Sequence, residues 1–362
     1  MPRRIAILGS TGSIGENTLR VIADNPERFT VAALAAGRNW ERLAEQARTF
    51  APPLVSVAGA EDAERLRGLL PPGTAVLSGE EGLREAAAGQ GAEIVVSALV
   101  GAAGLAPTLA AIEAGASVAL ANKEVLVMAG ELVTARAAAR GAAILPIDSE
   151  HAGVAQALSG RPREEVARIV LTASGGPFRT RTLEEMRGVT PEEALRHPNW
   201  KMGPKITVDS ASMMNKGLEI IEARWLFGLE PERVDVLVHP QSIVHAMVEF
   251  IDGTVLAQMS VPDMRLPIAQ ALSHPERIPS RAPRLDLAQI GNLTFEEPDL
   301  ERFACLAHAK AALREGGTAP AVLNAANEVA VAAFLANGVG FLDIPDVVGA
   351  ALDGCATGSA LE

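Results

Sequence analysis

Two carboxylates stand one residue apart after an apolar run, and their spacing suggests a cation site. Asp148 and Glu150 follow the run AILPI, with Ser149 between them. In an extended segment alternate side chains share a face, so the sequence predicts both carboxylates on one side. Neighbouring carboxylates repel each other unless a cation or a proton lies between them. Oxygen ligands of this kind suit Mg²⁺ or Mn²⁺, although such a pair alone is more often ordinary surface charge.

A polar stripe further along the chain adds a second group of candidates. The segment from Val208 to Phe227 predicts one helix that is capped at Asp209 or Ser210 and ended by Gly228. On that helix a hydroxyl, an amide, an ammonium and a carboxylate share one face. They belong to Ser212, Asn215, Lys216 and Glu219. The first three types bind phosphate, and the carboxylate is a candidate metal ligand.

The segment that leads into this helix is locally basic, although the chain as a whole is acidic. Lysine and arginine number 32 against 44 aspartates and glutamates, a net charge of −12. Residues 196–216 nevertheless contain more basic than acidic side chains, and such a local positive charge would attract an anionic substrate. Within them, residues 197–205 read HPNWKMGPK. Trp200 is predicted either to cover a ligand as part of a lid or to be anchored in the core.

A glycine-rich turn near the N-terminus indicates a dinucleotide site. Gly9, Gly12 and Gly15 follow the first predicted strand and open the first helix, where unpaired N–H groups attract a pyrophosphate. The alternative is a structural turn. At the end of the second strand the chain offers Arg38 and no carboxylate, which favours the 2′-phosphate of NADPH over NADH. A solvated arginine is the alternative at that position.

The composition excludes several classes of protein. Hydrophobic residues make up 48% and charged residues 21% of the chain, as in a globular protein. The acidic balance disfavours nucleic acid as a partner. Two cysteines support neither a disulfide framework nor a thiolate zinc site, which fits a cytoplasmic protein. Because the chain has no tyrosine, reductases that use a tyrosine as proton donor are excluded.

The chain shows no membrane or targeting signal. The uncharged stretch 94–112 is interrupted by glycine and proline, so it predicts a strand, a turn and a helix and no membrane span. The N-terminus predicts no signal peptide.

The elements that position these residues change character along the chain. Through residue 147, short apolar runs alternate with helical segments, which predicts an α/β Rossmann-like domain with a doubly wound parallel sheet. Residues 148–274 predict an α+β catalytic domain, in which Ile-Asp-Gly at 251–253 joins two strands as a hairpin. A linker at 275–300 and a C-terminal α-helical bundle at 301–362 follow.

Six motifs, read in order, resemble the 1-deoxy-D-xylulose 5-phosphate reductoisomerase family. They are GSTGSIG at the start, ANKE at 121–124, DSEH at 148–151, TASGGPF at 172–178, HPNWKMGPKITVDSASMMNKGLE at 197–219 and HPQSIVHAMVEF at 239–250. The resemblance covers nearly the whole chain. It implies an enzyme that converts 1-deoxy-D-xylulose 5-phosphate and NADPH to 2-C-methyl-D-erythritol 4-phosphate, with Mg²⁺, Mn²⁺ or Co²⁺. It also implies a homodimer with a cofactor domain, a catalytic domain and a C-terminal helical domain.

The resemblance also assigns roles to individual residues. The implied metal ligands are Asp148, Glu150 and Glu219, with Lys123 beside them. The implied substrate contacts are Ser149, Glu150, Ser174, His197, Ser210, Asn215, Lys216 and Glu219, under the lid residue Trp200. The implied nucleotide contacts are Thr11, Gly12, Ser13, Ile14, Gly37, Arg38, Asn39, Asn122, Glu124 and Gly203. Lys123, Asp148, Glu150, His197 and Glu219 form the implied catalytic group.

Two departures and two rival classes accompany this interpretation. Arg38 stands where the family often has lysine, and the chain ends at Glu362, earlier than a full helical bundle of the family. One rival is a metal-independent, NADP-dependent two-domain reductase of sugars or semialdehydes, which would not need the three carboxylates. The other is a non-enzymatic NADP sensor, which has no use for the 197–219 block. Loss of activity on chelation separates the first rival from the metal-dependent enzyme.

Overall fold

A computed structural model describes residues 1–200, 202–355 and 358, and the chain divides into two compact units. Lys201, which lies in the predicted lid, falls outside the described residues. So do residues 356–357 and 359–362 at the end of the predicted helical bundle. The first unit comprises residues 1–125, 132–148 and 263–282. The second comprises 126–131, 149–262 and the described part of 283–362.

The first unit is built on a seven-stranded sheet in the order β4-β3-β2-β1-β5-β6-β7, with every pair parallel. This confirms the predicted Rossmann-like sheet. Its strands are β1 (Arg3–Leu8), β2 (Phe29–Ala35), β3 (Leu54–Val57), β4 (Ala75–Ser78), β5 (Ile94–Ser97), β6 (Ser117–Leu120) and β7 (Ile144–Pro146). Most of their residues are buried, as expected of strands covered on both faces. Because β5 lies next to β1, the chain reverses its strand order there, which is where doubly wound folds bind ligands.

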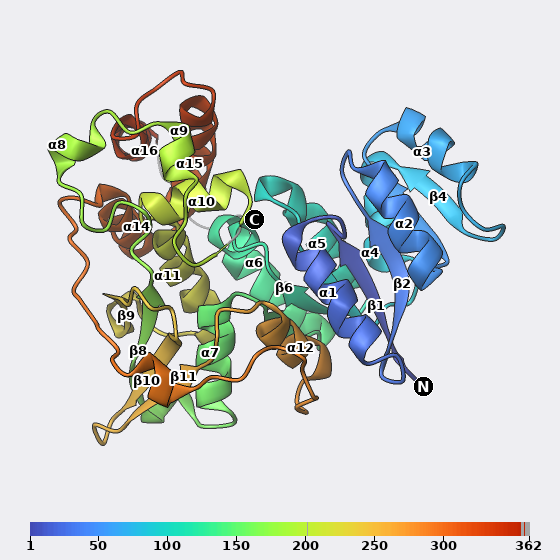
Figure 1. The fold of residues 1–362 in the computed structure, drawn as a ribbon, viewed down its shortest axis with the longest axis horizontal. Helices are drawn as coiled ribbons and strands as arrows, with labels where there is room; N and C mark the ends of the chain where they lie inside the picture. Colours follow the sequence, from blue (N-terminus) through green and yellow to red (C-terminus); the bar gives the residue numbers. More distant parts are fainter. Residues whose placement is uncertain (201, 356–357, 359–362) are drawn as a thin grey trace. The chain divides into compact units, whose positions relative to one another are not determined.

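Helices connect these strands (Figure 1). They are α1 (Ser13–Asp24), α2 (Trp40–Phe50), α3 (Ala60–Arg67), α4 (Gly79–Ala88), η1 (Gly101–Gly104), α5 (Leu105–Glu113) and α6 (Glu124–Arg140), part of which belongs to the second unit. α12 (Arg265–Ser273) packs against α1 although it is far away in sequence. The segment 94–112 forms β5, η1 and most of α5, as predicted. Among the described residues, no helix is both long enough and apolar enough to span a bilayer.

The second unit contains a four-stranded mixed sheet in the order β11-β10-β8-β9. The strands are β8 (Val166–Ala173), β9 (Val234–Val238), β10 (Val244–Phe250) and β11 (Val255–Met259). β10 runs antiparallel to both β8 and β11, and β8 runs parallel to β9. The predicted hairpin at Ile-Asp-Gly therefore joins β10 and β11.

The remaining elements of this unit are helical, and α14, α15 and α16 pack on one another as the predicted C-terminal bundle (Figure 1). The helices are α7 (Ser149–Leu158), η2 (Arg163–Glu165), α8 (Leu183–Met186), α9 (Pro191–Ala194), α10 (Pro204–Ala211), α11 (Met214–Phe227), η3 (Pro231–Arg233), α13 (Leu287–Ile290), α14 (Ala304–Glu315), α15 (Ala319–Leu335) and α16 (Asp343–Gly354). One apolar core joins the sheet, α11 and these terminal helices.

The helix expected from Asp209 or Ser210 to Phe227 is instead two helices. α10 begins at Pro204, the first-turn position that proline favours, and ends at Ala211. The chain then turns at Met213, whose φ of +62° is left-handed, before α11 starts. The Ser212 hydroxyl accepts from the Met214 N–H at 3.4 Å, a local bond that competes with helix continuation. Asp209 therefore lies inside α10 and is not an N-cap, whereas Gly228 ends α11 in the left-handed conformation as predicted.

The compact units also differ from the domain limits inferred from sequence. Residues 263–282 pack with the first unit, whereas the sequence places 263–274 in the catalytic domain and 275–282 in the linker. Ile268 and Leu272 of α12 are fully buried in the core of the first unit. The helices after residue 300 belong to the same compact unit as the mixed sheet. Sequence spacing reveals each element but does not say against which sheet an isolated helix packs.

Candidate active site

The glycine-rich turn has the geometry of a nucleotide site. It links β1 to α1, and Gly12 stands at the N-cap of α1 without a side-chain cap. Gly9 has a φ of +89°, and a Cβ atom there would lie 2.4 Å from the Ala98 carbonyl oxygen. A Cβ atom on Gly15 would lie 2.4 Å from the Ser10 Cα. Only glycine fits both positions, so the turn folds tightly and the first amides of α1 stay free of side chains.

The predicted nucleotide residues occupy three places in the first unit. Thr11, Ser13 and Ile14 lie in the same turn and first helical residues, with Gly12 and Ser13 exposed. Gly37, Arg38 and Asn39 follow β2 and are also exposed. The Asn39 side chain caps α2 by accepting from the Arg42 N–H at 3.2 Å.

Asn122 and Glu124 follow β6 and are both buried. The Asn122 amide donates to the carbonyl oxygens of Leu99 at 2.7 Å and Gly101 at 3.0 Å, and its oxygen accepts from the Val125 N–H. The side chain of Asn122 therefore ties the loop after β5 to the start of α6. We assign it this structural role beside any contact with a nucleotide.

Three carboxylates gather at the start of α7 and on α11. Oxygen atoms of Asp148, Glu150 and Glu219 lie within 4.8 Å of one another. Glu219 is fully buried, while Asp148 and Glu150 are partly exposed. Asp148 also pairs with the buried Lys123 ammonium at 2.6 Å. This all-oxygen donor set suits a hard divalent cation.

Lys216 and Asn215 hold the carboxylates from one side. The Lys216 ammonium lies 2.7 Å from Glu150 and also pairs with Glu219, and its side chain is only 3% exposed. The Asn215 amide donates to the other oxygen of Glu219. Burial acts to lower the pKa of Lys216, but the charges of Glu150 and Glu219 outweigh it and raise that pKa above its ordinary value. Lys216 is therefore a cation that balances two carboxylates.

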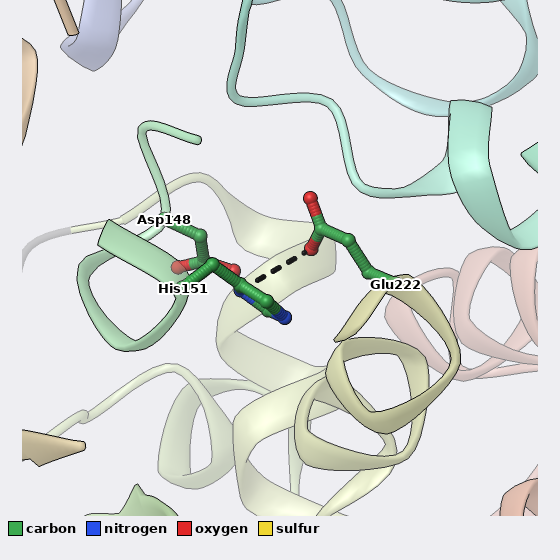
Figure 2. A group of neighbouring side chains, drawn as sticks. All are labelled: Asp148, His151 and Glu222. Atoms are coloured by element: carbon green, nitrogen blue, oxygen red, sulfur yellow. Dashed lines mark ion pairs between the residues drawn. The ribbon is translucent and has the colours of Figure 1, made fainter. Parts of the chain in front are cut away.

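His151 and Glu222 form a second buried pair (Figure 2). His151 Nδ1 lies 3.5 Å from a Glu222 oxygen, and both side chains are essentially inaccessible to solvent. His151 Nε2 is 2.9 Å from the Glu219 carbonyl oxygen, so it donates to the backbone of a candidate metal ligand. With Asp148 these two residues also satisfy the spacing of a metal group. We favour the carboxylate group, because it offers oxygen ligands alone.

Sequence reasoning missed this pair, although a signal was present. Glu222 falls on the apolar face of α11 that Leu218, Ile221 and Trp225 define, and a lone carboxylate on a buried face normally has a partner. His151 ends the DSEH motif, yet no short-range spacing connects it to Glu222.

Residues 197–200 are organised around the ring of His197. Its Nδ1 accepts the backbone N–H groups of Asn199 at 3.1 Å and Trp200 at 3.0 Å. The proton therefore resides on Nε2, which lies 3.0 Å from the Ser174 hydroxyl oxygen and donates to it. Burial lowers the pKa of His197 to about 4. His197 is thus a neutral hydrogen-bond donor that fixes both the loop and Ser174.

Asn199 and Trp200 place this loop against the segment before β10. The Asn199 amide donates to the Pro240 carbonyl oxygen at 2.7 Å and the Ser242 hydroxyl at 2.8 Å. The half-buried Trp200 ring lies 6.4 Å from the ring of His245. Trp200 is therefore neither exposed nor a fully buried core residue.

The remaining predicted residues flank these groups. Gly203 is the N-cap of α10, and Ser210 lies in its last turn. The Ser149 hydroxyl donates to Glu150 at 2.5 Å. Lys205 pairs with the buried Asp209 carboxylate at 2.8 Å, so part of the positive charge that the sequence shows in 196–216 is neutralised.

We expect His197 to make the protein less stable in acid. Its pKa falls from the ordinary 6.5 to about 4 on folding. Between these values the unfolded chain binds a proton that the folded chain does not, so stability is complete above about pH 6.5 and is lost as the pH falls toward about 4. Urea unfolding of the wild type and His197→Gln at both ends of this window measures the effect.

The His197→Gln variant should lose less stability on acidification than the wild type. His274→Gln, at an exposed histidine, is the matched control and should follow the wild type. Identical acid sensitivity of all three proteins would contradict the assignment of a neutral, half-buried His197.

Family models match nearly the entire chain. The model described as 1-deoxy-D-xylulose 5-phosphate reductoisomerase matches residues 5–130, and the model of that enzyme's C-terminal domain matches residues 144–227. A further model, described as DXP reductoisomerase C-terminal domain, matches residues 259–362.

Relatives and solved structures agree with these models. The 1-deoxy-D-xylulose 5-phosphate reductoisomerase of Heliobacterium modesticaldum is 57% identical over 98% of this chain and 91% of its own length. That of Anaeromyxobacter dehalogenans is 56% identical over 95% of this chain and 88% of its own.

Two crystal structures are similar over nearly the full length. The Zymomonas mobilis enzyme in complex with NADPH has a TM-score of 0.94 and 45% identity, covering 100% of this chain and 94% of that one. A DOX-P reductoisomerase in complex with NADPH, fosmidomycin and magnesium has a TM-score of 0.92 and 45% identity, with 97% and 89% covered. The chain therefore belongs to the 1-deoxy-D-xylulose 5-phosphate reductoisomerase family.

Proposed function

We propose that this chain converts 1-deoxy-D-xylulose 5-phosphate to 2-C-methyl-D-erythritol 4-phosphate, with NADPH as reductant and a divalent cation, in the non-mevalonate route to isoprenoids. The observation that carries the proposal is the group of Asp148, Glu150 and Glu219 in a chain of this family. A metal-independent reductase would have no use for three converging carboxylates. Crystallised relatives bind NADPH and magnesium, which supports the same cofactors here.

We assign the cation to Asp148, Glu150 and Glu219, with Mg²⁺ or Mn²⁺ as the expected ions and Co²⁺ as a further candidate. Three carboxylate oxygens within 4.8 Å of one another offer the hard ligands that these ions prefer. Lys123 and Lys216 balance the charge of the cluster and hold two of the carboxylates in place.

The phosphate of the substrate is assigned to hydroxyl, amide and ammonium groups of the second unit. They are Ser174, Ser210, Asn215 and Lys216, while Ser149 and His197 are assigned as further substrate contacts. His197 supports the assignment because its Nε2 donates to Ser174, which leaves the Ser174 proton free to point at an anion. We place Trp200 over the bound substrate as a lid residue, supported by its half-buried position.

NADPH is assigned to the turns that follow β1, β2 and β6. The pyrophosphate would lie at the N-terminus of α1, where Thr11, Ser13 and Ile14 offer backbone N–H groups. Gly12, whose own N–H bonds to the Gly9 carbonyl oxygen, would allow close approach. Arg38 and its neighbours Gly37 and Asn39 would bind the 2′-phosphate side, and Asn122, Glu124 and Gly203 complete the assignment.

The reaction depends on precise placement of the metal-binding carboxylates and the substrate more than on a nucleophilic side chain of the protein. When bound, the divalent cation polarises substrate oxygens and NADPH supplies the hydride. The protein's own task is to hold the carboxylates at fixed positions, which Lys123, Lys216 and Asn215 do by direct contact. Binding the phosphate at a site away from the reacting carbons holds those carbons in a fixed position for the reaction. Closure of 197–205 would exclude water from the rearranging substrate.

Oxidation of NADPH with 1-deoxy-D-xylulose 5-phosphate, followed by absorbance, tests the proposed function. We expect turnover that EDTA abolishes and that Mg²⁺ or Mn²⁺ restores. Turnover that persists in EDTA would favour a metal-independent reductase. No turnover with any of these ions, together with tight binding of NADPH, would favour a sensor.

We expect Arg38→Asp to reduce or invert the preference for NADPH over NADH. The exposed guanidinium follows β2, and no carboxylate stands at that strand end to bind a ribose 2′-hydroxyl. Loss of a charge-assisted phosphate contact should cost roughly 1.5–3 kcal/mol, or about 10- to 150-fold in KM for NADPH. Steady-state kinetics with both nucleotides measures this; Arg48→Asp, on the last turn of α2, is the control. Equal use of both nucleotides by the wild type would contradict the role of Arg38.

We also propose that the enzyme is a cytoplasmic homodimer with the three functional domains inferred from sequence. β11 is an edge strand of the mixed sheet, and its Val255 and Leu256 are exposed together with Ile251 of the hairpin. An exposed apolar edge strand is suited to pairing with a second chain. Both cysteines are free thiols, as in a reducing compartment. Light scattering in solution measures the mass of the assembly.

A further inference from the structure

Gln46 is a buried polar side chain that links the two turns assigned to NADPH. It lies on α2, the helix that starts directly after Arg38 and Asn39, and is only 2% exposed. Its Nε2 donates to the Ser10 carbonyl oxygen in the glycine-rich turn at 2.9 Å. The same nitrogen donates to a Glu16 carboxylate oxygen on α1 at 2.9 Å. One side-chain amide therefore connects the segment after β2 to the turn after β1.

A charged contact on the outer side of Gln46 strengthens this link. Arg42, one turn earlier on α2, binds both oxygens of Glu16, with Nε at 2.6 Å and Nη2 at 2.8 Å. Hydrogen bonds from Arg42, aided by its charge and by Gln46, lower the pKa of Glu16. The Arg42 N–H is in turn capped by Asn39. Glu16 stands in the first turn of α1, and Arg42 balances a charge that would otherwise repel a pyrophosphate there.

Backbone bonds hold the bases of the two turns together, because the N–H groups of Gly9 and Ser10 both donate to the Ala35 carbonyl oxygen at the end of β2, at 2.9 Å each. The Arg38 side chain is exposed, as are Gly12 and Ser13 of the glycine-rich turn. Arg42 is itself 44% exposed, so water competes for its contacts. Gln46 is buried, and its bond to Ser10 is shielded from water. Among the side-chain contacts from α2, the bond from Gln46 is therefore the shielded one, and it adds to the backbone bonds at the Ala35 carbonyl oxygen.

We propose that Gln46 is a positioning residue for NADPH, which holds the pyrophosphate turn and Arg38 at the spacing that the dinucleotide requires. The inference rests on the proposed function and adds a residue to it. Gln46 lies beneath the turn and acts through Ser10 and through α2. The alternative is that Gln46 only fills space between α1 and α2 and contributes stability alone.

A double-mutant cycle with Arg38 separates the two possibilities. The dissociation constant of NADPH is measured by fluorescence titration for the wild type, Gln46→Met, Arg38→Ala and the double variant. Methionine has a similar size but cannot donate to Ser10. We expect Gln46→Met to raise the dissociation constant about 5- to 30-fold, with a smaller effect of Arg38→Ala in its presence than in the wild type. Strictly multiplicative effects, or an unchanged constant, would overturn the proposal.

Hydrogen exchange of the free protein gives a readout that needs no cofactor. The amide of Glu16 bonds to the Gly12 carbonyl at 2.9 Å and that of Gly12 to the Gly9 carbonyl at 3.1 Å. These amides should exchange faster in Gln46→Met. Gln90→Met, which removes a side-chain bond from Gln90 to Glu85 in the same unit, is the matched control and should alter neither exchange in the turn nor NADPH binding. Unchanged protection of the turn in Gln46→Met would overturn the proposal.

Gln46→Asn serves as a second variant if methionine prevents folding. It keeps the amide but is one methylene shorter, so it cannot reach Ser10 and should reproduce the weaker binding and faster exchange. Failure of the proposed function has a different signature, because the wild type itself would then bind NADPH no better than NADH. A wild type that binds NADPH tightly, with both Gln46 variants unchanged, overturns only the role of Gln46.

Discussion

Glu219→Gln should reduce turnover by roughly a thousandfold or more, a loss of about 4 kcal/mol of transition-state stabilisation. Glu219 is fully buried, and its carboxylate meets those of Asp148 and Glu150. A neutral amide of the same shape is a poorer ligand for a hard cation. Isothermal titration with Mn²⁺ should show binding at least about tenfold weaker than in the wild type.

The surface variant Glu232→Gln is the control for this experiment. Glu232 belongs to η3 and is 68% exposed, so its loss should leave both turnover and Mn²⁺ binding unchanged. If Glu219→Gln kept both wild-type turnover and wild-type affinity for Mn²⁺, the carboxylate group would not be the metal site. A loss of turnover with unchanged metal affinity would instead restrict Glu219 to binding the substrate.

Lys216→Met should lower the free energy of unfolding by about 3–5 kcal/mol and also weaken substrate binding. The buried ammonium balances Glu150 and Glu219, and without it two carboxylates face each other at low exposure. Their repulsion destabilises the fold. Saturating Mg²⁺ should restore part of the stability, because a cation between the carboxylates replaces the lost charge. Urea unfolding with and without Mg²⁺ measures both effects.

Lys310→Met on α14 is the matched control, since Lys310 is half-buried and lies outside the carboxylate group. Its stability should change by less than about 1 kcal/mol and should not depend on Mg²⁺. A Lys216→Met variant as stable as the wild type, with unchanged KM for the substrate, would show that Lys216 neither balances the carboxylates nor contacts phosphate.

The sequence alone predicted the strands and the fold class of both sheets. Apolar runs such as RIAIL and EIVVSAL correspond to β1 and β5, and Ile-Asp-Gly forms the expected hairpin. These signals are local: alternation or continuity of apolar residues and the turn preferences of glycine decide them within a few residues. The family motifs likewise identified the residues that the structure gathers into the carboxylate group.

Local signals failed where two of them competed. Val208–Phe227 has uninterrupted helical spacing, yet the helix breaks at Met213 because the Ser212 hydroxyl offers a local alternative to the helical bond. Proline opposes a helix in its interior but favours the first turn, and α10 starts at Pro204. Sequence spacing cannot decide between these outcomes without the surrounding core.

The tertiary structure alone decided which polar groups are paired. Lys216 reaches Glu150, 66 residues away, and His151 meets the Glu219 carbonyl 68 residues away. Gln46 meets Ser10 across 36 residues; helical spacing from Leu43 places it on the apolar face of α2 but does not indicate its partner. Residue types set which groups are able to bind a cation or a phosphate. Which of them are desolvated, and therefore obliged to find a partner, depends on how the helices and sheets pack.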